Sequence, residues 1–176
     1  MAVVEFFSLQ RQHAALRPAL DLASARVFGA GNFILGAEVE KFEHDFAAYV
    51  GVKHAVGVGN GLEALGLLLK ALRVGPGDEV IVPGHTFIAT WLAAEQVGAT
   101  VVPVDVDPVN YNIDPAQVRM AITSRTRAII AVHLYGQPAD MNSLDEISKE
   151  HGIPLLEDAA QAHGATLDGR KTGGLG

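Results

Sequence analysis

Two helical patterns occupy the first fifty residues of the chain. Apolar residues from about Gln12 to Phe28 have mixed helical spacing, and a glycine-rich run at residues 29–32 then breaks the pattern. From Ala37 to Tyr49, four apolar residues fall on one helix face at spacings of three and four: Val39, Phe42, Phe46 and Tyr49. This second pattern predicts a surface helix that ends at Gly51. We therefore predict N-terminal helices over about residues 1–50 and an α/β core over about residues 51–176.

After residue 51, short apolar runs alternate with helical patterns. Strands are predicted at residues 54–58, 79–82, 100–104, 128–133 and 153–156. Helices are predicted at residues 62–72, 86–97, 115–122 and 140–150. The helix at 62–72 is apolar almost all round, which indicates a buried helix. The alternation predicts an α/β fold with three layers, in which helices cover both faces of a mostly parallel sheet.

The composition excludes several classes of protein. The 176 residues carry a net charge of −7 without a Lys/Arg cluster, which argues against a nucleic-acid or membrane partner. The chain has no cysteine, so disulfides, thiolate chemistry and Cys-ligated zinc are excluded. No apolar run is long enough to span a bilayer, and residues 1–10 lack the basic region of a signal peptide. The expected location is the cytoplasm.

Small and polar residues follow each predicted strand. The carboxyl ends of parallel strands meet at one edge of a sheet, so these residues can assemble a single site from several loops. They are Gly59-Asn60-Gly61, Pro83-Gly84-His85, Asp105-Val106-Asp107, His133-Leu134-Tyr135-Gly136 and Glu157-Asp158.

The last of these strand ends is the most informative. A short apolar run delivers Asp158 to the edge of the sheet, and the small residues Ala159 and Ala160 follow it. A carboxylate with small neighbours suits a flat, cationic heterocycle. The pyridinium nitrogen of pyridoxal phosphate (PLP) is the best-known case.

The glycines at residues 57–61 have two interpretations. Small residues between a strand and a helix let backbone N–H groups approach a phosphate at the helix N-terminus, but the same residues also suit a tight turn without a ligand. A Rossmann dinucleotide site is disfavoured, because the G-x-G-x-x-G spacing fails at Leu62 and no acidic residue ends the next strand.

Asp105 and Asp107 suggest a competing chemistry. A D-x-D pair at a strand end can hold a divalent metal and a nucleotide-sugar diphosphate, as in some glycosyltransferases. We favour a plain turn here, since Asp107 precedes a proline and no basic residue for a diphosphate lies nearby. The histidines lack a metal-site spacing. Those that follow strands, His85, His133 and His163, suit either a functional role or a structural hydrogen bond.

Several ordered motifs together resemble the DegT/DnrJ/StrS sugar aminotransferases, which are PLP enzymes of the aspartate-aminotransferase fold type. The motifs lie at residues 33–43, 60–65, 74–83, 85–90, 111–115, 133–141 and 157–165, and the resemblance covers nearly the whole chain. It implies a homodimer with its active site at the subunit interface, to which residues 33–36 contribute. It also implies transfer of an amino group from glutamate to a nucleotide-linked keto-deoxysugar, with the 3-keto group favoured over the 4-keto group.

The resemblance implies a PLP site from residues of this chain. Asp158 is expected to bond the protonated pyridine nitrogen, and Gln161 to face the ring 3'-oxygen. Phe87 is expected to stack on one face of the ring and Ala160 to touch the other.

The phosphate is expected at the backbone of Gly61 and Leu62, the latter in place of a hydroxyl residue that many members have.

The family's Schiff-base lysine is expected beyond Gly176, in a segment that this sequence does not include. The resemblance therefore implies the N-terminal part of a PLP-binding large domain, inactive by itself and without the small C-terminal domain. Two alternatives stay open. Relatives with histidine in place of the lysine are PLP-dependent dehydratases, and a chain that keeps only the scaffold would be a binding module.

Overall fold

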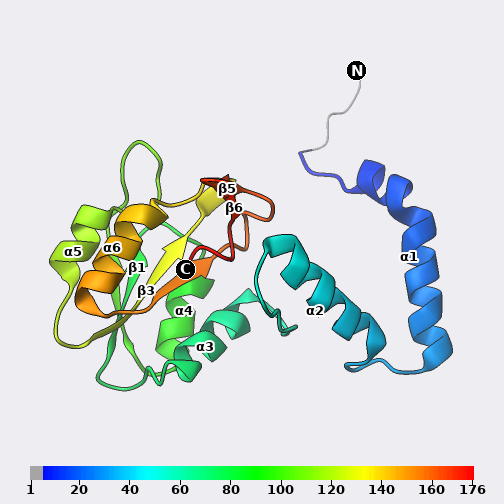
Figure 1. Cartoon of the computed structure of the whole chain (residues 1–176), viewed down its shortest axis with the longest axis horizontal. Coiled ribbons are helices and arrows are strands. Elements are labelled where there is room, and N and C mark those ends of the chain that lie inside the picture. Colours follow the sequence, from blue (N-terminus) through cyan, green and yellow to red (C-terminus); the bar gives the residue numbers. More distant parts are fainter. Residues whose placement is uncertain (1–5) are drawn as a thin grey trace. The chain divides into compact units, whose positions relative to one another are not determined.

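The computed structural model describes residues 6–176 and divides the chain into two compact units (Figure 1). Of the described residues, the N-terminal unit comprises residues 6–45 and the core unit residues 46–176. The start of the chain, where we predict no signal peptide, lies partly outside the described residues.

The N-terminal unit contains α1 (Gln10–Ala30) and the first part of α2 (Ala37–Val50), close to the two predicted helices. Helix α1 ends where the glycine-rich run begins, and Gly31 caps it with a left-handed φ of 65°. No residue of α1 is buried. Within this unit, Arg26 and Glu38 form an exposed ion pair at 2.5 Å.

The core unit is built on a four-stranded parallel sheet in the order β2-β1-β3-β4. Its strands are β1 (Glu79–Pro83), β2 (Thr100–Val104), β3 (Thr126–Val132) and β4 (Leu155–Asp158). β1 and β3 occupy the centre and are buried along almost their whole length, which explains their continuous apolar sequence. A short hairpin that was not predicted, β5 (Thr166–Leu167) and β6 (Arg170–Lys171), follows the sheet.

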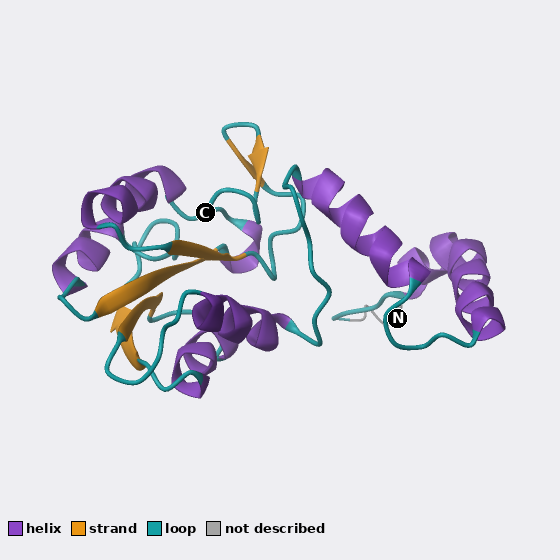
Figure 2. Cartoon of the chain, turned by 60° about the horizontal axis from the view of Figure 1, so that its bottom comes forward, coloured by secondary structure: helices purple, strands orange, loops and turns teal. Residues whose placement is uncertain are grey.

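Helices cover both faces of this sheet, so the predicted three-layer α/β architecture is confirmed (Figure 2). On one face, α5 (Pro115–Ala121) and α6 (Met141–His151) pack around Ile81, Ile129 and Leu144. On the other face, α3 (Gly61–Ala71) and α4 (Ala89–Gln96) pack around Leu69, Val80 and Ile130. A 3-10 turn, η1 (Leu134–Gly136), follows β3.

Helix starts in the core unit follow local capping chemistry. Asp114 accepts a hydrogen bond from the N–H of Ala116, and Pro115 occupies the first turn of α5. Asp140 accepts from the N–H of Ser143 at the start of α6, which ends at Gly152 with a φ of 65°.

Three local predictions are wrong. Residues 54–58 form no strand, because no neighbour pairs with them, and Val56 is 78% exposed. The helix predicted from Thr86 begins only at Ala89, because residues 84–86 form a bend after β1. The helix predicted as buried, α3, buries Leu65 and Leu69 but leaves Leu67 52% exposed, since only one of its faces meets the sheet.

Candidate PLP site at the carboxyl edge of the sheet

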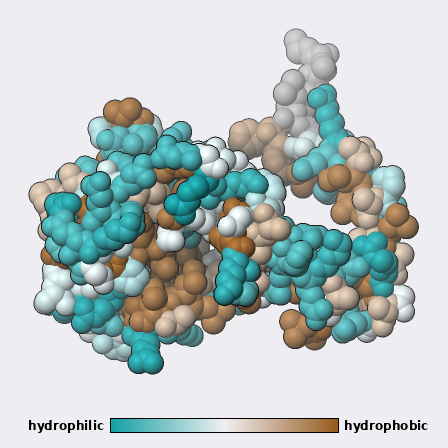
Figure 3. Space-filling model, viewed as in Figure 1, coloured by the Kyte–Doolittle hydropathy of each residue, from teal (hydrophilic) through white to brown (hydrophobic). Residues whose placement is uncertain are grey.

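A cavity of about 460 Å³ opens at the carboxyl edge of the sheet, on the face covered by α3 and α4. Figure 3 shows hydrophobic residues gathered over these helices in the core unit. The walls of the cavity consist mainly of apolar side chains: Leu62, Leu65, Phe87, Ile88, Leu92, Val132 and Leu134. A largely apolar concavity with a few polar groups is typical of a cofactor or small-molecule site.

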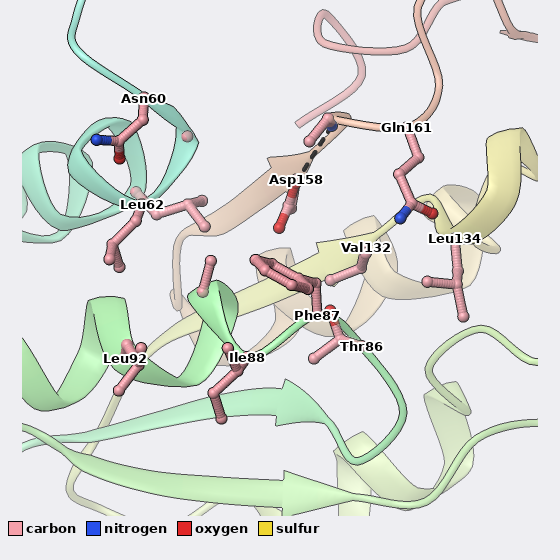
Figure 4. Close-up of a pocket in the computed structure, with 14 residues that line it drawn as sticks. Asn60, Leu62, Thr86, Phe87, Ile88, Leu92, Val132, Leu134, Asp158 and Gln161 are labelled. Carbon is pink, nitrogen blue, oxygen red and sulfur yellow. Dashed lines mark hydrogen bonds between the residues drawn. The ribbon is translucent and has the colours of Figure 1, made fainter. Parts of the chain in front are cut away.

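All six residues expected at a PLP site line this one cavity: Gly61, Leu62, Phe87, Asp158, Ala160 and Gln161 (Figure 4). They come from three segments that are far apart in the sequence, namely the start of α3, the bend before α4 and the end of β4. The parallel sheet brings the segments that follow β1 and β4 together because its strands all end at the same edge. The start of α3 joins them because α3 and α4 pack in one hydrophobic cluster on this face of the sheet.

Among residues 6–176, Asp158 is the only acidic residue in the wall of the cavity. Its Oδ1 accepts a hydrogen bond from the N–H of Ala160 at 3.2 Å (Figure 4). Its Oδ2 accepts a hydrogen bond from the hydroxyl of Thr90 at 3.0 Å. Thr90 is completely buried and contacts the hydroxyl of Thr86 at 2.9 Å. The sequence reasoning missed both threonines, although a hydroxyl four residues from another on a predicted helix is a weak signal of a shared partner.

Gln161 is oriented by the turn that follows β3. Its Oε1 accepts a hydrogen bond from the backbone N–H of Tyr135 at 2.8 Å. Tyr135 has a left-handed φ of 54°, a sparsely populated conformation for a residue with a side chain. Since the amide oxygen is engaged, the NH₂ group is the part of Gln161 left to donate to a ligand.

The N-terminus of α3 forms another wall. Asn60 caps the helix by accepting the N–H of Glu63 at 2.9 Å, and the N–H groups of Gly61 and Leu62 precede the first intrahelical bond. A helix start of this kind carries a partial positive charge and free donors, which suits an anion.

Phe87 and Ala160 leave space for a flat ring. The Phe87 side chain is 69% exposed and lies in the cavity below Asp158 (Figure 4). Ala160 is exposed and presents only a methyl group. Large aromatic side chains are usually buried in the core of a folded protein. One that is exposed on the wall of an apolar cavity is typical of a surface on which a ligand ring stacks.

His133, one of the histidines that follow strands, has a structural role. It is fully buried, its Nδ1 accepts the N–H of Ala139 at 3.0 Å, and its Nε2 lies 2.9 Å from Glu157. The proton must therefore be on Nε2, which donates to the Glu157 carboxylate. Neither His85 nor His163 lines the cavity; their rings lie near Tyr135 and Phe46, respectively.

Glu157 is a polar centre that the sequence reasoning did not single out. Besides His133, it accepts hydrogen bonds from the N–H groups of Gly173, Leu175 and Gly176 at 2.8, 2.5 and 2.6 Å. Burial raises the pKa of this carboxyl group, but the four donors outweigh burial, so the pKa of Glu157 lies below its ordinary value. Glu157 thus fastens the last described residues to β4.

Asp105 and Asp107 act in a turn. Asp107 accepts the N–H groups of Val109 and Asn110 at 2.8 and 3.0 Å, and Asp105 accepts the N–H of Val106. These bonds fit the turn interpretation over the glycosyltransferase alternative. Within residues 6–176, no group of three or more His, Cys, Asp or Glu residues is placed to hold a metal ion.

The five lysines lie away from the cavity wall. Lys171 is near the hairpin, where its Nζ bonds the carbonyl of Tyr49 and lies 3.9 Å from the centre of the Tyr49 ring. Lys41 and Lys149 form exposed ion pairs with Asp45 and Asp145.

In the described part of the chain, no helix has the length and apolar character needed to cross a membrane.

Several known proteins with similar sequences carry sugar-aminotransferase names. The chain is 52% identical over 170 residues to dTDP-3-amino-3,4,6-trideoxy-alpha-D-glucose transaminase of Streptomyces venezuelae, covering 97% of this chain and 45% of that enzyme. It is 47% identical over 174 residues to dTDP-3-amino-3,6-dideoxy-alpha-D-galactopyranose transaminase of Aneurinibacillus thermoaerophilus, covering 99% of this chain and 48% of that enzyme. The chain thus spans about half the length of these relatives.

Solved structures give the same result. The crystal structure of DesV from S. venezuelae matches with a TM-score of 0.96 at 51% identity, over 98% of this chain and 47% of DesV. NtdA from Bacillus subtilis, solved with bound cofactor PMP, matches with a TM-score of 0.88 at 32% identity, over 94% of this chain and 38% of NtdA. The model of the DegT/DnrJ/EryC1/StrS aminotransferase family matches residues 19–176. The expected resemblance is therefore confirmed, and the chain belongs to the DegT/DnrJ/EryC1/StrS aminotransferase family.

Proposed function

We propose that the protein carrying this chain is a PLP-dependent nucleotide-sugar aminotransferase, and that this chain is the N-terminal part of its PLP-binding large domain. The observation that carries the proposal is the position of Asp158, a hydrogen-bonded carboxylate in the wall of an apolar cavity that the start of α3 also lines. The chain covers about half of its relatives, so the remaining parts of the enzyme are expected in residues that this sequence does not include.

The donors and acceptors in the cavity fit the cofactor. Asp158 would hold the proton on the pyridine nitrogen, and the NH₂ group of Gln161 would donate to the ring 3'-oxygen. Phe87 and Ala160 would contact the two ring faces. When bound, PLP supplies an electron sink that stabilises a carbanion beside the reacting nitrogen.

The phosphate would bind at the start of α3. The backbone N–H groups of Gly61 and Leu62 would donate to it, and the helix dipole would favour its negative charge. The side chain of Leu62 adds no hydrogen bond, so the backbone must supply this part of the affinity.

The proposed substrate is a nucleotide-linked 3-keto-deoxysugar, with glutamate as the amino donor. The names of two relatives place the amino group on carbon 3 of a dTDP-sugar, which supports the 3-keto preference. The expected compartment stays the cytoplasm.

A labelled amino group tests this function directly. The full-length protein is incubated with PLP, ¹⁵N-glutamate and a dTDP-linked 3-keto-6-deoxyhexose, and the sugar nucleotide is analysed by mass spectrometry and NMR. We expect ¹⁵N on carbon 3. Loss of water from the sugar without nitrogen transfer would instead identify the dehydratase alternative, and no reaction with 3-keto or 4-keto substrates would refute the proposal.

The position of the lysines gives a second test. Because no lysine lines the cavity, we expect residues 1–176 alone to give only scattered, partial labelling after incubation with PLP and reduction with borohydride. Peptide mapping by mass spectrometry measures it. One stoichiometric adduct at a single lysine would show that the catalytic lysine does not lie beyond Gly176.

We also propose that the protein is a homodimer. Phe33, Ile34 and Leu35 are 65%, 83% and 73% exposed, which is unusual for three consecutive large apolar residues on a monomer. Light scattering at micromolar concentration checks this. A single mass of 18.5 kDa for this chain would count against the proposal.

A further inference from the structure

Two threonine hydroxyls form a chain that ends on the carboxylate of Asp158. Thr90 lies in the first turn of α4, 68 residues before Asp158, and its hydroxyl reaches across to Oδ2 at 3.0 Å. Thr86 lies in the bend before α4, and its hydroxyl contacts that of Thr90 at 2.9 Å. Thr86 also lines the cavity, whereas Thr90 is completely buried behind it.

The direction of these hydrogen bonds follows from the number of protons. A carboxylate only accepts, and a hydroxyl has a single proton. Thr90 therefore donates to Asp158, and Thr86 must donate to Thr90. Both donors point toward the negative charge, so each bond polarises and strengthens the next.

This arrangement is specific to Asp158 rather than a by-product of burial. A threonine in a helix can satisfy its hydroxyl on a backbone carbonyl of the preceding turn of its own helix. Thr90 instead bonds a side chain on another element. With Ala160 on Oδ1 and Thr90 on Oδ2, donors from two separate segments fix the plane of the carboxylate.

We infer that Thr90 is a positioning residue that orients the carboxylate of Asp158 toward the ring nitrogen of the cofactor, with Thr86 supporting Thr90 from the cavity wall. This inference rests on the proposed function. Without the Thr90 hydroxyl, only the N–H of Ala160 holds the carboxylate, which is then free to turn. A carboxylate that turns away from the ring nitrogen holds the proton there less well.

The test uses pyridoxamine 5'-phosphate (PMP) labelled with ¹⁵N in the ring, because PMP needs no lysine to bind. The full-length protein is prepared as wild type, Thr90→Val and Thr90→Ser, and the ring ¹⁵N chemical shift and the PMP dissociation constant are measured at neutral pH. We expect a protonated ring nitrogen in the wild type and in Thr90→Ser. In Thr90→Val we expect a shift toward the unprotonated value and about tenfold weaker binding, the typical loss for a hydrogen bond to a charged group.

Thr126→Val is the matched control, because Thr126 is also buried and its hydroxyl accepts the N–H of Thr123 at the opposite edge of the sheet. It should lose stability without changing the ¹⁵N shift. If Thr90→Val keeps the wild-type shift and binds PMP within about twofold, the inference is wrong while the proposed function stands. If the wild type does not bind PMP, or binds it with an unprotonated ring nitrogen, both are wrong.

Discussion

Replacing Asp158 with asparagine removes a charge from the cavity and leaves the size of the side chain unchanged. One carboxylate oxygen becomes an NH₂ group, which cannot accept the N–H of Ala160 if it lies on that side. On the other side, the Thr90 hydroxyl can turn to accept from the NH₂ group and donate to Thr86. The structure thus offers the amide an arrangement that keeps its bonds to Ala160 and Thr90, and we expect a loss of stability of only about 1 kcal/mol.

The expected effect on catalysis is much larger. The carboxylate is the proposed charge partner of the ring nitrogen, and loss of a buried, charge-assisted hydrogen bond costs about 3 kcal/mol. If the whole cost is felt in the transition state, the rate falls by about two decades.

The assay compares the transamination rates of full-length wild type and Asp158→Asn at saturating cofactor, with the melting temperature of each protein as the control. A residue that only caps a turn would tolerate this change, since asparagine is a good turn and cap residue. A variant that melts normally and keeps more than about half of the wild-type rate would refute the assignment of Asp158 to the cofactor.

Three further changes probe other parts of the site. The pKa of Glu157 is lower in the folded than in the unfolded chain, where a glutamate has a pKa of about 4.3. The hydrogen bonds of Glu157 therefore stabilise the fold fully above that pH, and this stabilisation is lost as the pH falls through the pKa of the folded state. Urea unfolding between about pH 6 and pH 3 should therefore show a steeper loss of stability in wild type than in Glu157→Gln, and equal slopes would contradict the assigned bonds. Leu62→Thr places a hydroxyl beside the proposed phosphate site, so PMP should bind about fivefold more tightly in a fluorescence titration, and unchanged affinity would argue against that site. Ala160→Leu should fill the space for the ring and weaken PMP binding more than about tenfold by equilibrium dialysis, with little change in melting temperature because Ala160 is exposed, and normal binding would show that the ring lies elsewhere.

Much of the fold could be predicted from the sequence because each element carries a local signal. The strand β2 matches its predicted bounds, and α6 shifts by only one residue at each end, since turn and cap residues mark these limits. Residues 54–58 show where such reasoning stops. Their composition suits a strand, but a strand also needs a neighbour to pair with, and periodicity carries no information on that neighbour.

Likewise, only some of the residues of the cavity could be predicted from the sequence. The position of Asp158 at this edge could be predicted because parallel strands end together, and the place of Gln161 followed from the resemblance to the family. The groups that orient them were not predicted. Thr90 lies 68 residues from its partner, and Tyr135 acts through a backbone N–H that any residue other than proline would supply. Contacts of this kind depend on tertiary packing, which no single segment encodes.

The neighbouring carboxylates of β4 make the pairing of this strand with β3 a functional constraint. Consecutive residues of a strand point to opposite faces, so Asp158 faces the cavity while Glu157 faces His133 and the last described residues. The pairing of Val132 with Asp158, and the bond from the His133 N–H to the Asp158 carbonyl, set which acid lies on which side. A slip of β4 by one residue toward its C-terminal end would put Glu157 in the place of Asp158 and Leu156 in the place of Glu157, which sends the longer glutamate side chain into the cavity and leaves His133 without its acceptor. Substitutions that disturb the pairing of β4 with β3, even at residues remote from any ligand, would therefore impair both the cavity on one face of the sheet and the contacts of Glu157 on the other.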